Sequence, residues 1–182
     1  MSGDEGPDVR VIVVMGVSGA GKTVVGEALA KALGWKFYDA DEFHSALNIA
    51  KMHRGEGLTD DDRLPWLATL TALVAGVVAR NQPTVLACSA LKQWYRNALV
   101  PANVSHNAIC FVYLDVPLGV LRTRLAARTH HFATPDLLPS QFATLEIPRD
   151  AICVDGTRSI AETVETVRTA LGLVKFDDES TA

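Results

Sequence analysis

The sequence predicts a three-layer α/β/α fold, in which a five-stranded parallel sheet is covered by helices on both faces. The length of 182 residues suits one domain. Short apolar, β-branched runs alternate with helical segments along the chain, which is typical of a parallel sheet with helices packed on it. The first run, VRVIVVM at residues 9–15, is continuously apolar, as expected of a strand that is buried on both faces.

The elements of the first half follow in order. A helix is expected from Lys22 and should end at Gly34, because glycine often ends helices. WKFYDA, at residues 35–40, is the second expected strand, and a helical stretch should run from about Ser45 to Gly55. The run that follows predicts another helix, because Thr59 precedes three acids that favour a helix start.

The second half repeats the alternation. The remaining expected strands are TVLACS (84–89), ICFVYLD (109–115) and AICVDG (151–156). Pro117 should open a helix, and further helices are expected over residues 136–145 and about 159–171, with a loop at 128–135. We predict that residues 1–182 form a single domain with flexible tails at 1–8 and about 174–182.

Composition narrows the class of protein. About 48% of the residues are apolar and 21% are charged, with a net charge of −4, so no basic surface for nucleic acid is expected. No apolar run approaches the ~20 residues of a membrane span, and the N-terminus lacks a secretory pattern. Cys88, Cys110 and Cys153 each lie in an apolar segment, so we expect three buried thiols and a cytoplasmic location.

The strongest motif follows the first strand directly. Residues 16–23, GVSGAGKT, fit G-x-x-x-x-G-K-[ST] between a buried strand and a helix, where this motif binds phosphate. Lys22 should reach the β- and γ-phosphates of ATP, and Thr23 should ligate Mg²⁺. The expected ATP-binding residues of the loop are Gly16, Val17, Ser18, Gly19, Ala20, Gly21, Lys22 and Thr23. The fold is therefore predicted to be that of a P-loop NTPase.

A phosphate loop alone does not name a function, because GTPases, motors and small-molecule kinases share it. A GTPase would need an N-K-x-D type of base reader, which the sequence lacks. A nucleic-acid motor would usually be larger and more basic. A short chain that begins with the loop favours a small-molecule phosphotransferase.

Residues 39–44, DADEFH, place acids at the end of the second expected strand, where ligands bind in such sheets. One of Asp39 and Asp41 is expected to hold Mg²⁺, and the other to orient an acceptor hydroxyl and take its proton. The spacing alone leaves a second interpretation open, in which the cluster is a solvated turn with a helix cap.

At this point the sequence resembles the gluconokinases of the P-loop type, which phosphorylate D-gluconate with ATP. The resemblance covers roughly residues 11–150 and rests on the phosphate loop and on three further segments. These are DADEFHSALNIAKMHRGEGLTDDDRLPWL (39–67), CSALKQWYR (88–96) and HFATPDLLPSQFATLEIP (131–148). The chain departs from the usual pattern at Thr23 (often Ser), Ala40 (often Gly), Ser45 (usually Pro) and His130 (usually Gly). None of these changes removes a group that the chemistry needs.

The resemblance implies ATP and Mg²⁺ as cofactors and D-gluconate as the acceptor. Lys22, Asp41 and Arg128 are the expected catalytic residues, and Thr23 and Asp39 the expected metal ligands. The candidates for binding the acceptor are Asp41, His44, Lys51, Arg63, Arg96, His131 and Gln141.

Arg63 and Arg96 are the better anchors for the carboxylate, because guanidinium binds it bidentately. Two alternatives stay open: Lys51 as a surface residue, and Arg63 as an ion-pair partner of the acids at 60–62. Tyr95 and Trp66 are expected to pack rather than to bind.

A lid is expected over about residues 122–135, where LRTRLAARTHHF carries three arginines. We assign Arg124 to the adenine base and Arg128 to the phosphates, with Arg122 on the surface. The lid should exclude water from the transfer. The turn at residues 155–157 is expected to line the adenine.

The predicted function is transfer of the γ-phosphate of ATP to D-gluconate, giving 6-phospho-D-gluconate. Two alternatives are a kinase of another small polyol acid such as shikimate, and a nucleotide-binding regulator without activity. No nucleic-acid or membrane partner is expected, and a homodimer is possible because the apolar helix LATLTALVAGVVA would suit either an interface or the core.

Overall fold

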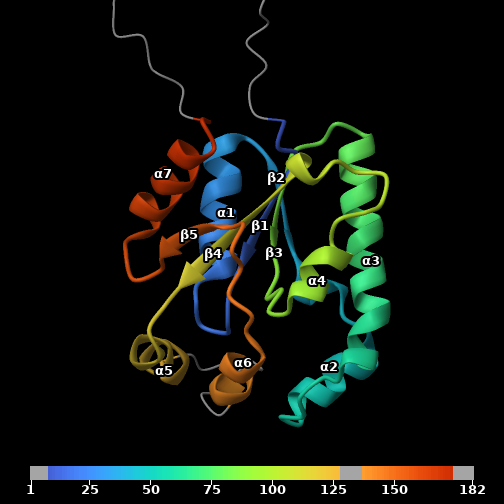
Figure 1. Ribbon diagram of the computed structural model, residues 1–182. Helices are drawn as coiled ribbons and strands as arrows, with labels where there is room; N and C mark the ends of the chain where they lie inside the picture. The colour runs from blue at the N-terminus through green and yellow to red at the C-terminus, as the bar shows by residue number, and fades with distance from the viewer. Residues whose placement is uncertain (1–7, 128–136, 174–182) are drawn as a thin grey trace, which may run out of the picture.

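The computed structural model describes residues 8–127 and 137–173, which form a five-stranded sheet between two layers of helices (Figure 1). The strand order is β2-β3-β1-β4-β5, and every neighbouring pair is parallel. The strands are β1 (Val11–Met15), β2 (Lys36–Asp39), β3 (Thr84–Ala87), β4 (Ile109–Asp115) and β5 (Ile152–Asp155). The predicted fold class and its five strands are confirmed.

The helices occupy both faces of the sheet and the end to which the strands point. They are α1 (Lys22–Leu33), α2 (Ala46–His53), α3 (Asp60–Ala79), α4 (Gln93–Ala98), α5 (Leu118–Ala126), α6 (Leu138–Thr144) and α7 (Ile160–Ala170), with 3₁₀ turns η1 (Ala40–Phe43) and η2 (His106–Ala108). In Figure 1, α1 and α7 lie on one side of the sheet, α3 and α4 lie on the other, and α2, α5 and α6 lie beyond the strand ends. The short helix α4 was not predicted.

The core has two parts, one on each face of the sheet. Val11 and Val13 of β1 face one part, and Ile12 and Val14 face the other, because successive side chains of a strand point to opposite sides. The first part takes Trp66, Leu67, Leu70, Val74 and Val77 from α3. The second takes Val25 and Leu29 from α1 and Val164 and Val167 from α7. A fully buried β1 thus holds the start of α1 rigidly at the centre of the molecule.

The cysteine prediction is only partly right. Cys88 is buried and Cys110 is half-buried, but Cys153 is exposed. The physical reason is that β5 lies at the edge of the sheet, and that Cys153 points to the face opposite Val154, which packs in the core.

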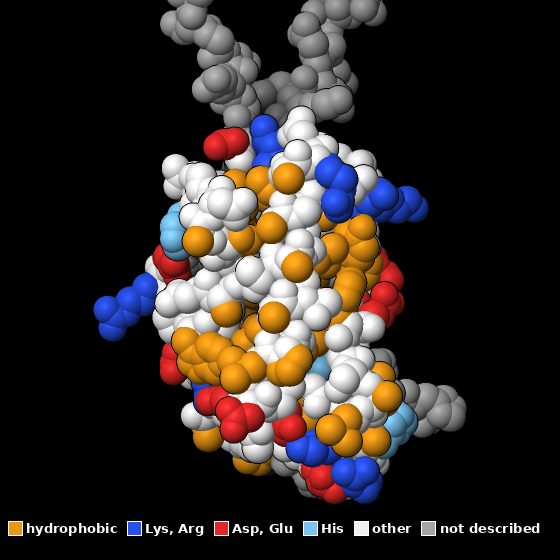
Figure 2. Space-filling view, turned by 90° about the vertical axis from the view of Figure 1, so that its right-hand side faces the viewer, with side chains coloured by type: hydrophobic (Ala, Val, Ile, Leu, Met, Phe, Trp, Pro, Cys, Tyr) orange, Lys and Arg blue, Asp and Glu red, His pale blue; other side chains and the backbone are white. Residues whose placement is uncertain are grey.

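Helix α3 is long and apolar enough to cross a membrane, by its length and composition alone, which the sequence reading did not anticipate. Five of its side chains lie in the core, so it is also a core helix of the sheet. Its outer face exposes Leu64, Pro65, Ala68 and Ala72. Figure 2 looks at this side of the molecule and shows apolar side chains over its middle, with charged side chains toward its ends.

Candidate active site

The phosphate loop links β1 to α1 and has a backbone that suits glycine. Gly16, Gly19 and Gly21 have φ angles of 146°, 83° and 99°, which other residues rarely adopt. A side chain at Gly16 would also come within 3.2 Å of the Leu114 carbonyl oxygen, and one at Gly19 within 3.1 Å of Leu125. The loop opens onto the N-terminus of α1, a place that favours anions.

Thr23 and Asp39 meet at the start of α1 and the end of β2. The Thr23 hydroxyl donates a hydrogen bond to Asp39 Oδ2 at 2.7 Å, and the Asp41 backbone N–H donates to Asp39 Oδ1 at 3.0 Å. Within the described ranges, no group of three or more His, Cys, Asp or Glu side chains suits a metal ion. A hydroxyl and one carboxylate still fit Mg²⁺, because this ion usually keeps water and phosphate oxygens as its other ligands.

A cavity of about 220 Å³ begins at this loop and extends toward α2, α3 and α6. Its polar lining includes Ser18, Lys22, Asp41, His44, Arg63 and Gln141. Its apolar lining includes Ile49, Met52, Leu58, Trp66 and Leu137. Five of the predicted catalytic and acceptor-binding residues therefore converge on one cavity, and a small polar anion suits its lining. We call it the acceptor pocket.

Asp39 and Asp41, two of the three acids in residues 39–44, face different partners. Asp39 bonds to Thr23, whereas Asp41 lines the acceptor pocket together with Lys22 and His44. The side chain of Asp39 also accepts the backbone N–H of Asp41 and so caps the turn η1. The cap of the second interpretation is therefore present, and Asp41 beside it lines the pocket, while the roles of the two acids in binding Mg²⁺ and in catalysis stay predictions.

His44 lies flat against Trp66, with ring centroids 4.5 Å apart and planes inclined by 10°. The indole N–H of Trp66 donates to the Ala40 carbonyl oxygen at 2.7 Å and so fixes the pair. Burial lowers the pKa of His44, Asp41 raises it to a smaller extent, and Arg63 lowers it further. Its buried Nδ1 has no hydrogen-bond partner within the described residues.

Gln141 of α6 connects the pocket to the phosphate loop. Its Oε1 accepts the backbone N–H of Ser18 at 2.7 Å, and its Nε2 donates to the Ser18 hydroxyl at 2.9 Å. Lys22 Nζ donates to the Val17 carbonyl oxygen at 3.2 Å on the same loop. The loop that meets phosphate and the helix that closes the pocket are therefore in direct contact.

Arg63 is held at the pocket wall by backbone and ring contacts. Its guanidinium donates to the carbonyl oxygens of Leu58 and Thr59 and lies 5.6 Å from the centre of the Tyr95 ring. The neighbouring acids have other partners: Asp60 pairs with Lys92 at 2.7 Å, and Asp62 pairs with Lys51 at 2.6 Å. The expected alternative, in which Arg63 pairs with these acids, is therefore not what the structure shows.

Two predicted acceptor residues do not reach the pocket lining. Lys51 points to Asp62 instead. Arg96 is 2% exposed, and its guanidinium donates to the carbonyl oxygens of Ala90 and Leu91 at 2.9 and 3.2 Å. The structure corrects the expectation for Arg96 because α4, which the sequence reading missed, turns this side chain under the 89–91 segment. That segment includes Ala90 in a left-handed conformation with φ 44°.

Tyr95 and Trp66 are buried at 3% and 4% exposure, as expected of packing residues, although Trp66 also lines the pocket. Ser89 and Ser140 line the pocket as well, and nothing in their sequence context distinguishes them.

Arg124 lies on the far side of the phosphate loop, beside a second hollow. Its guanidinium donates to the Ala20 carbonyl oxygen at 3.3 Å and to the Gly156 carbonyl oxygen at 2.8 Å. The hollow is lined by Gly19, Gly21, Arg124, Gly156 and Arg158, among others. The two features predicted to meet adenine, Arg124 and the turn at 155–157, thus lie together. Arg128 and His131, with residues 128–135 of the predicted lid, lie outside the described residues.

The comparisons with known proteins agree with this geometry. A family model described as "AAA domain" matches residues 11–145. A probable gluconokinase of Mus musculus is 44% identical over 178 residues, which cover 88% of this chain and 97% of the mouse protein. The chain belongs to the gluconokinase family. The resemblance found in the sequence is therefore confirmed.

Other gluconokinases match over similar lengths. The gluconokinase of Gluconobacter oxydans is 47% identical over 141 residues, which cover 78% of each chain. The crystal structure of a gluconokinase from Sinorhizobium meliloti 1021 superposes with a TM-score of 0.79 at 41% identity, covering 93% of this chain and 94% of that one. The chain thus shares the gluconokinase fold over nearly its whole length.

Proposed function

We propose that the protein transfers the γ-phosphoryl group of ATP to D-gluconate and yields 6-phospho-D-gluconate and ADP. The observation that carries this proposal is the position of Lys22. This lysine of the phosphate loop lines the same cavity as Asp41 and Arg63, so a transferred phosphoryl group and an anionic acceptor would meet there. The membership in the gluconokinase family supports the choice of gluconate.

ATP would lie along the loop at residues 16–23, with its phosphates against the backbone N–H groups and the start of α1. Arg124 and the turn at 155–157 would meet the adenine, which the second hollow supports. Thr23 and Asp39 would hold Mg²⁺. The ion, when bound, neutralises charge on the phosphate oxygens and orients them.

In the transfer itself, Asp41 orients the acceptor hydroxyl and takes its proton. The hydroxyl oxygen forms a bond to the γ-phosphorus while the bond between that phosphorus and the β–γ bridging oxygen breaks, and ADP leaves with the electron pair. Lys22 offsets the charge that develops on the phosphoryl oxygens. Arg128 is assigned the same task and stays a prediction from sequence.

The acceptor would be recognised by its carboxylate and its hydroxyls separately. Arg63 is the expected partner of the carboxylate, because its guanidinium is fixed at the pocket wall. His44 and Gln141 line the same pocket and are the expected partners of the acceptor hydroxyls. His131 keeps its predicted role in the same site.

The test is an acceptor screen with detection of ADP. We expect turnover with D-gluconate, weaker turnover with gluconamide, which has the same hydroxyls but no charge, and none with shikimate. Preferential turnover of shikimate would favour the alternative kinase. Binding of ATP without ADP formation in the presence of any acceptor would favour the regulator.

We also propose that the protein is a cytoplasmic homodimer. The cysteines are all free, which suits a reducing compartment. The outer face of α3 is apolar over several turns, and burying it against a second copy would remove it from water. Light scattering on the wild type and on Ala72→Glu tests the assembly, and the variant should be monomeric.

A further inference from the structure

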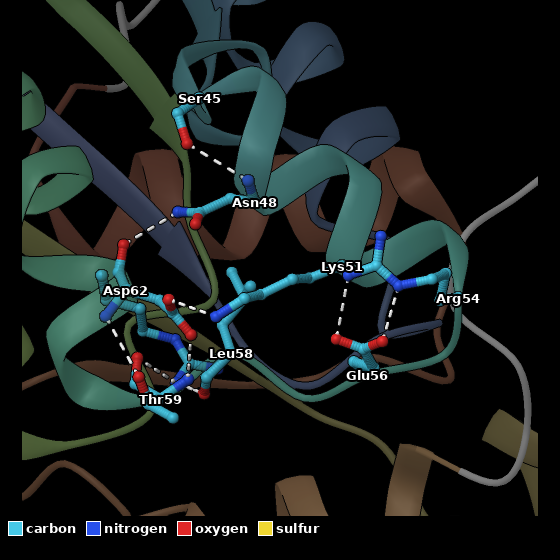
Figure 3. A network of polar contacts seen from close by, with 9 residues as sticks. Ser45, Asn48, Lys51, Arg54, Glu56, Leu58, Thr59 and Asp62 are labelled. Atoms are coloured by element: carbon cyan, nitrogen blue, oxygen red, sulfur yellow. Dashed lines mark hydrogen bonds and ion pairs between the residues drawn. The ribbon is translucent and has the colours of Figure 1, made fainter.

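Asp62 joins three segments around the acceptor pocket, as Figure 3 shows. Its Oδ1 accepts a hydrogen bond from Lys51 Nζ of α2 at 2.6 Å, and its Oδ2 accepts from the backbone N–H of Thr59 at 2.9 Å. Its own carbonyl oxygen accepts from Asn48 Nδ2 at 2.8 Å. Its backbone N–H also donates to the Thr59 hydroxyl at 3.2 Å, so one residue at the start of α3 contacts both α2 and Thr59 twice.

These contacts are more shielded from solvent than the ion pair that lies between Lys51 and Asp62 in the sequence. The side chains of Lys51 and Asp62 are 28% and 13% exposed, and Asn48 is 4% exposed. Arg54 and Glu56 form a pair of the same 2.6 Å length, but their side chains are 55% and 50% exposed. Exposed pairs contribute little, so the shielded pair is the one expected to fix geometry.

Helix α2 contributes no side chain to the two apolar parts of the core. Asn48 is its buried residue, and Leu47 is 65% exposed. A helix outside the apolar core depends more on its polar contacts, and two of these, from Asn48 and Lys51, reach Asp62. The bond from Lys51 and the backbone bond from Thr59 hold the pKa of Asp62 at about 2, so its carboxylate is ionised throughout the physiological range.

The segments that Asp62 joins form one wall of the acceptor pocket. Ile49 and Met52 of α2, the loop residues 56–58, and Arg63, which follows Asp62, all line it. Arg63 in turn donates to the carbonyl oxygen of Leu58 in that loop. A shift of α2 or of the loop would therefore move both the apolar wall and the guanidinium.

We propose that Asp62 is a positioning residue for the acceptor, which holds α2 and Arg63 in place through Lys51 and Asn48. Lys51 then acts through Asp62 and does not touch the acceptor. This inference rests on the proposed function for its kinetic consequence, but the anchoring of α2 is independent of the acceptor.

The test uses Asp62→Asn and Lys51→Met, singly and together. Asparagine keeps an oxygen for the Thr59 N–H but cannot form the ion pair. We expect kcat/KM for gluconate to fall about 10- to 100-fold in each variant, as misplacement of a binding group does, while KM for ATP stays within about twofold. The double variant should be no worse than either single one, because both remove one contact.

Two matched controls separate anchoring from general loss of stability. Glu162→Gln weakens the other capping box, at the start of α7, and Glu165→Gln breaks the ion pair with Arg168 on the same helix, away from the pocket. Both should keep the gluconate KM of the wild type. Amide hydrogen exchange over residues 46–53 should rise in Asp62→Asn and Lys51→Met and stay unchanged in the two controls.

Each result decides the matter. Additive losses in the double variant would show that Lys51 binds the acceptor directly, and unchanged exchange in α2 would overturn the anchoring. If the wild type failed to phosphorylate gluconate, the proposed function would fall, and the exchange measurement would still decide the role of Asp62.

Discussion

The phosphate loop and the acceptor pocket share Ser18 and Lys22 but are held in place in different ways. Backbone conformation shapes the loop, which sits between the fully buried strand β1 and helix α1. The pocket wall consists of side chains from η1, α2, α3 and α6, connected mainly by polar contacts. The nucleotide side is therefore held in place by the backbone of the core. The acceptor side depends on individual side chains, so substitutions there can change it without loss of the fold.

The largest expected effect distinguishes Asp39 and Asp41, which lie between the phosphate loop and the acceptor pocket. Asp41→Asn should lower kcat about 10²- to 10⁴-fold at every Mg²⁺ concentration, because it removes the group that positions and deprotonates the hydroxyl. Asp39→Asn should instead raise the Mg²⁺ requirement and recover activity at high Mg²⁺. A titration of kcat with Mg²⁺ distinguishes them, with ATP binding checked by calorimetry. Exchanged phenotypes would exchange the two roles.

The next largest effect belongs to the shared lysine. Lys22→Ala should lower kcat about 10²- to 10³-fold, since it removes a charge aimed at the transferred phosphoryl group. Thermal unfolding and circular dichroism should match the wild type, because the loop is shaped by its glycines. Turnover within a few-fold of the wild type would disprove the assignment of the phosphate loop.

A substitution of Arg96 tests whether its buried guanidinium stabilises the fold or binds the acceptor. Arg96→Met should lower the free energy of unfolding by about 2–3 kcal/mol, because the carbonyl oxygens of Ala90 and Leu91 lose their donors. The gluconate KM of the folded variant should change little. Denaturant unfolding and steady-state kinetics measure both, and a large rise in KM without loss of stability would restore Arg96 to the acceptor site.

The smallest effect is a pH dependence at His44. Its pKa in the folded protein is lowered mainly by burial, from a usual value of 6.5. At pH values below 6.5, His44 binds a proton more readily in the unfolded chain than in the folded one. Its neutral form therefore contributes fully to stability above pH 6.5, and this contribution declines as the pH falls toward the lowered pKa of the folded protein. His44→Gln should remove this part of the decline, as measured by urea unfolding over a pH series. Parallel curves for the two proteins would contradict it.

Local sequence determined the nucleotide side almost completely. The strand at residues 9–15, the motif at 16–23 and the stop at Gly34 were read correctly, because each is set by residues that are neighbours in the chain. Thr59 and the three acids after it marked the start of α3 for the same reason, and the structure adds that Thr59 and Asp62 form a capping box. Five residues that line the pocket were also predicted from the sequence: Lys22 through the phosphate-loop motif, Asp41 through its place after the second strand, and His44, Arg63 and Gln141 through the resemblance to gluconokinases.

Only the tertiary structure decided which charged side chains face the pocket and which face each other. From sequence, Lys51, Arg63 and Arg96 were all candidates for binding the acceptor, with the two arginines preferred for its carboxylate. The structure separates them because α2 brings Lys51 to Asp62, and α4 turns Arg96 beneath Ala90 and Leu91. The partner of a long cationic side chain depends on contacts between segments that are distant in sequence, and no local pattern encodes those contacts.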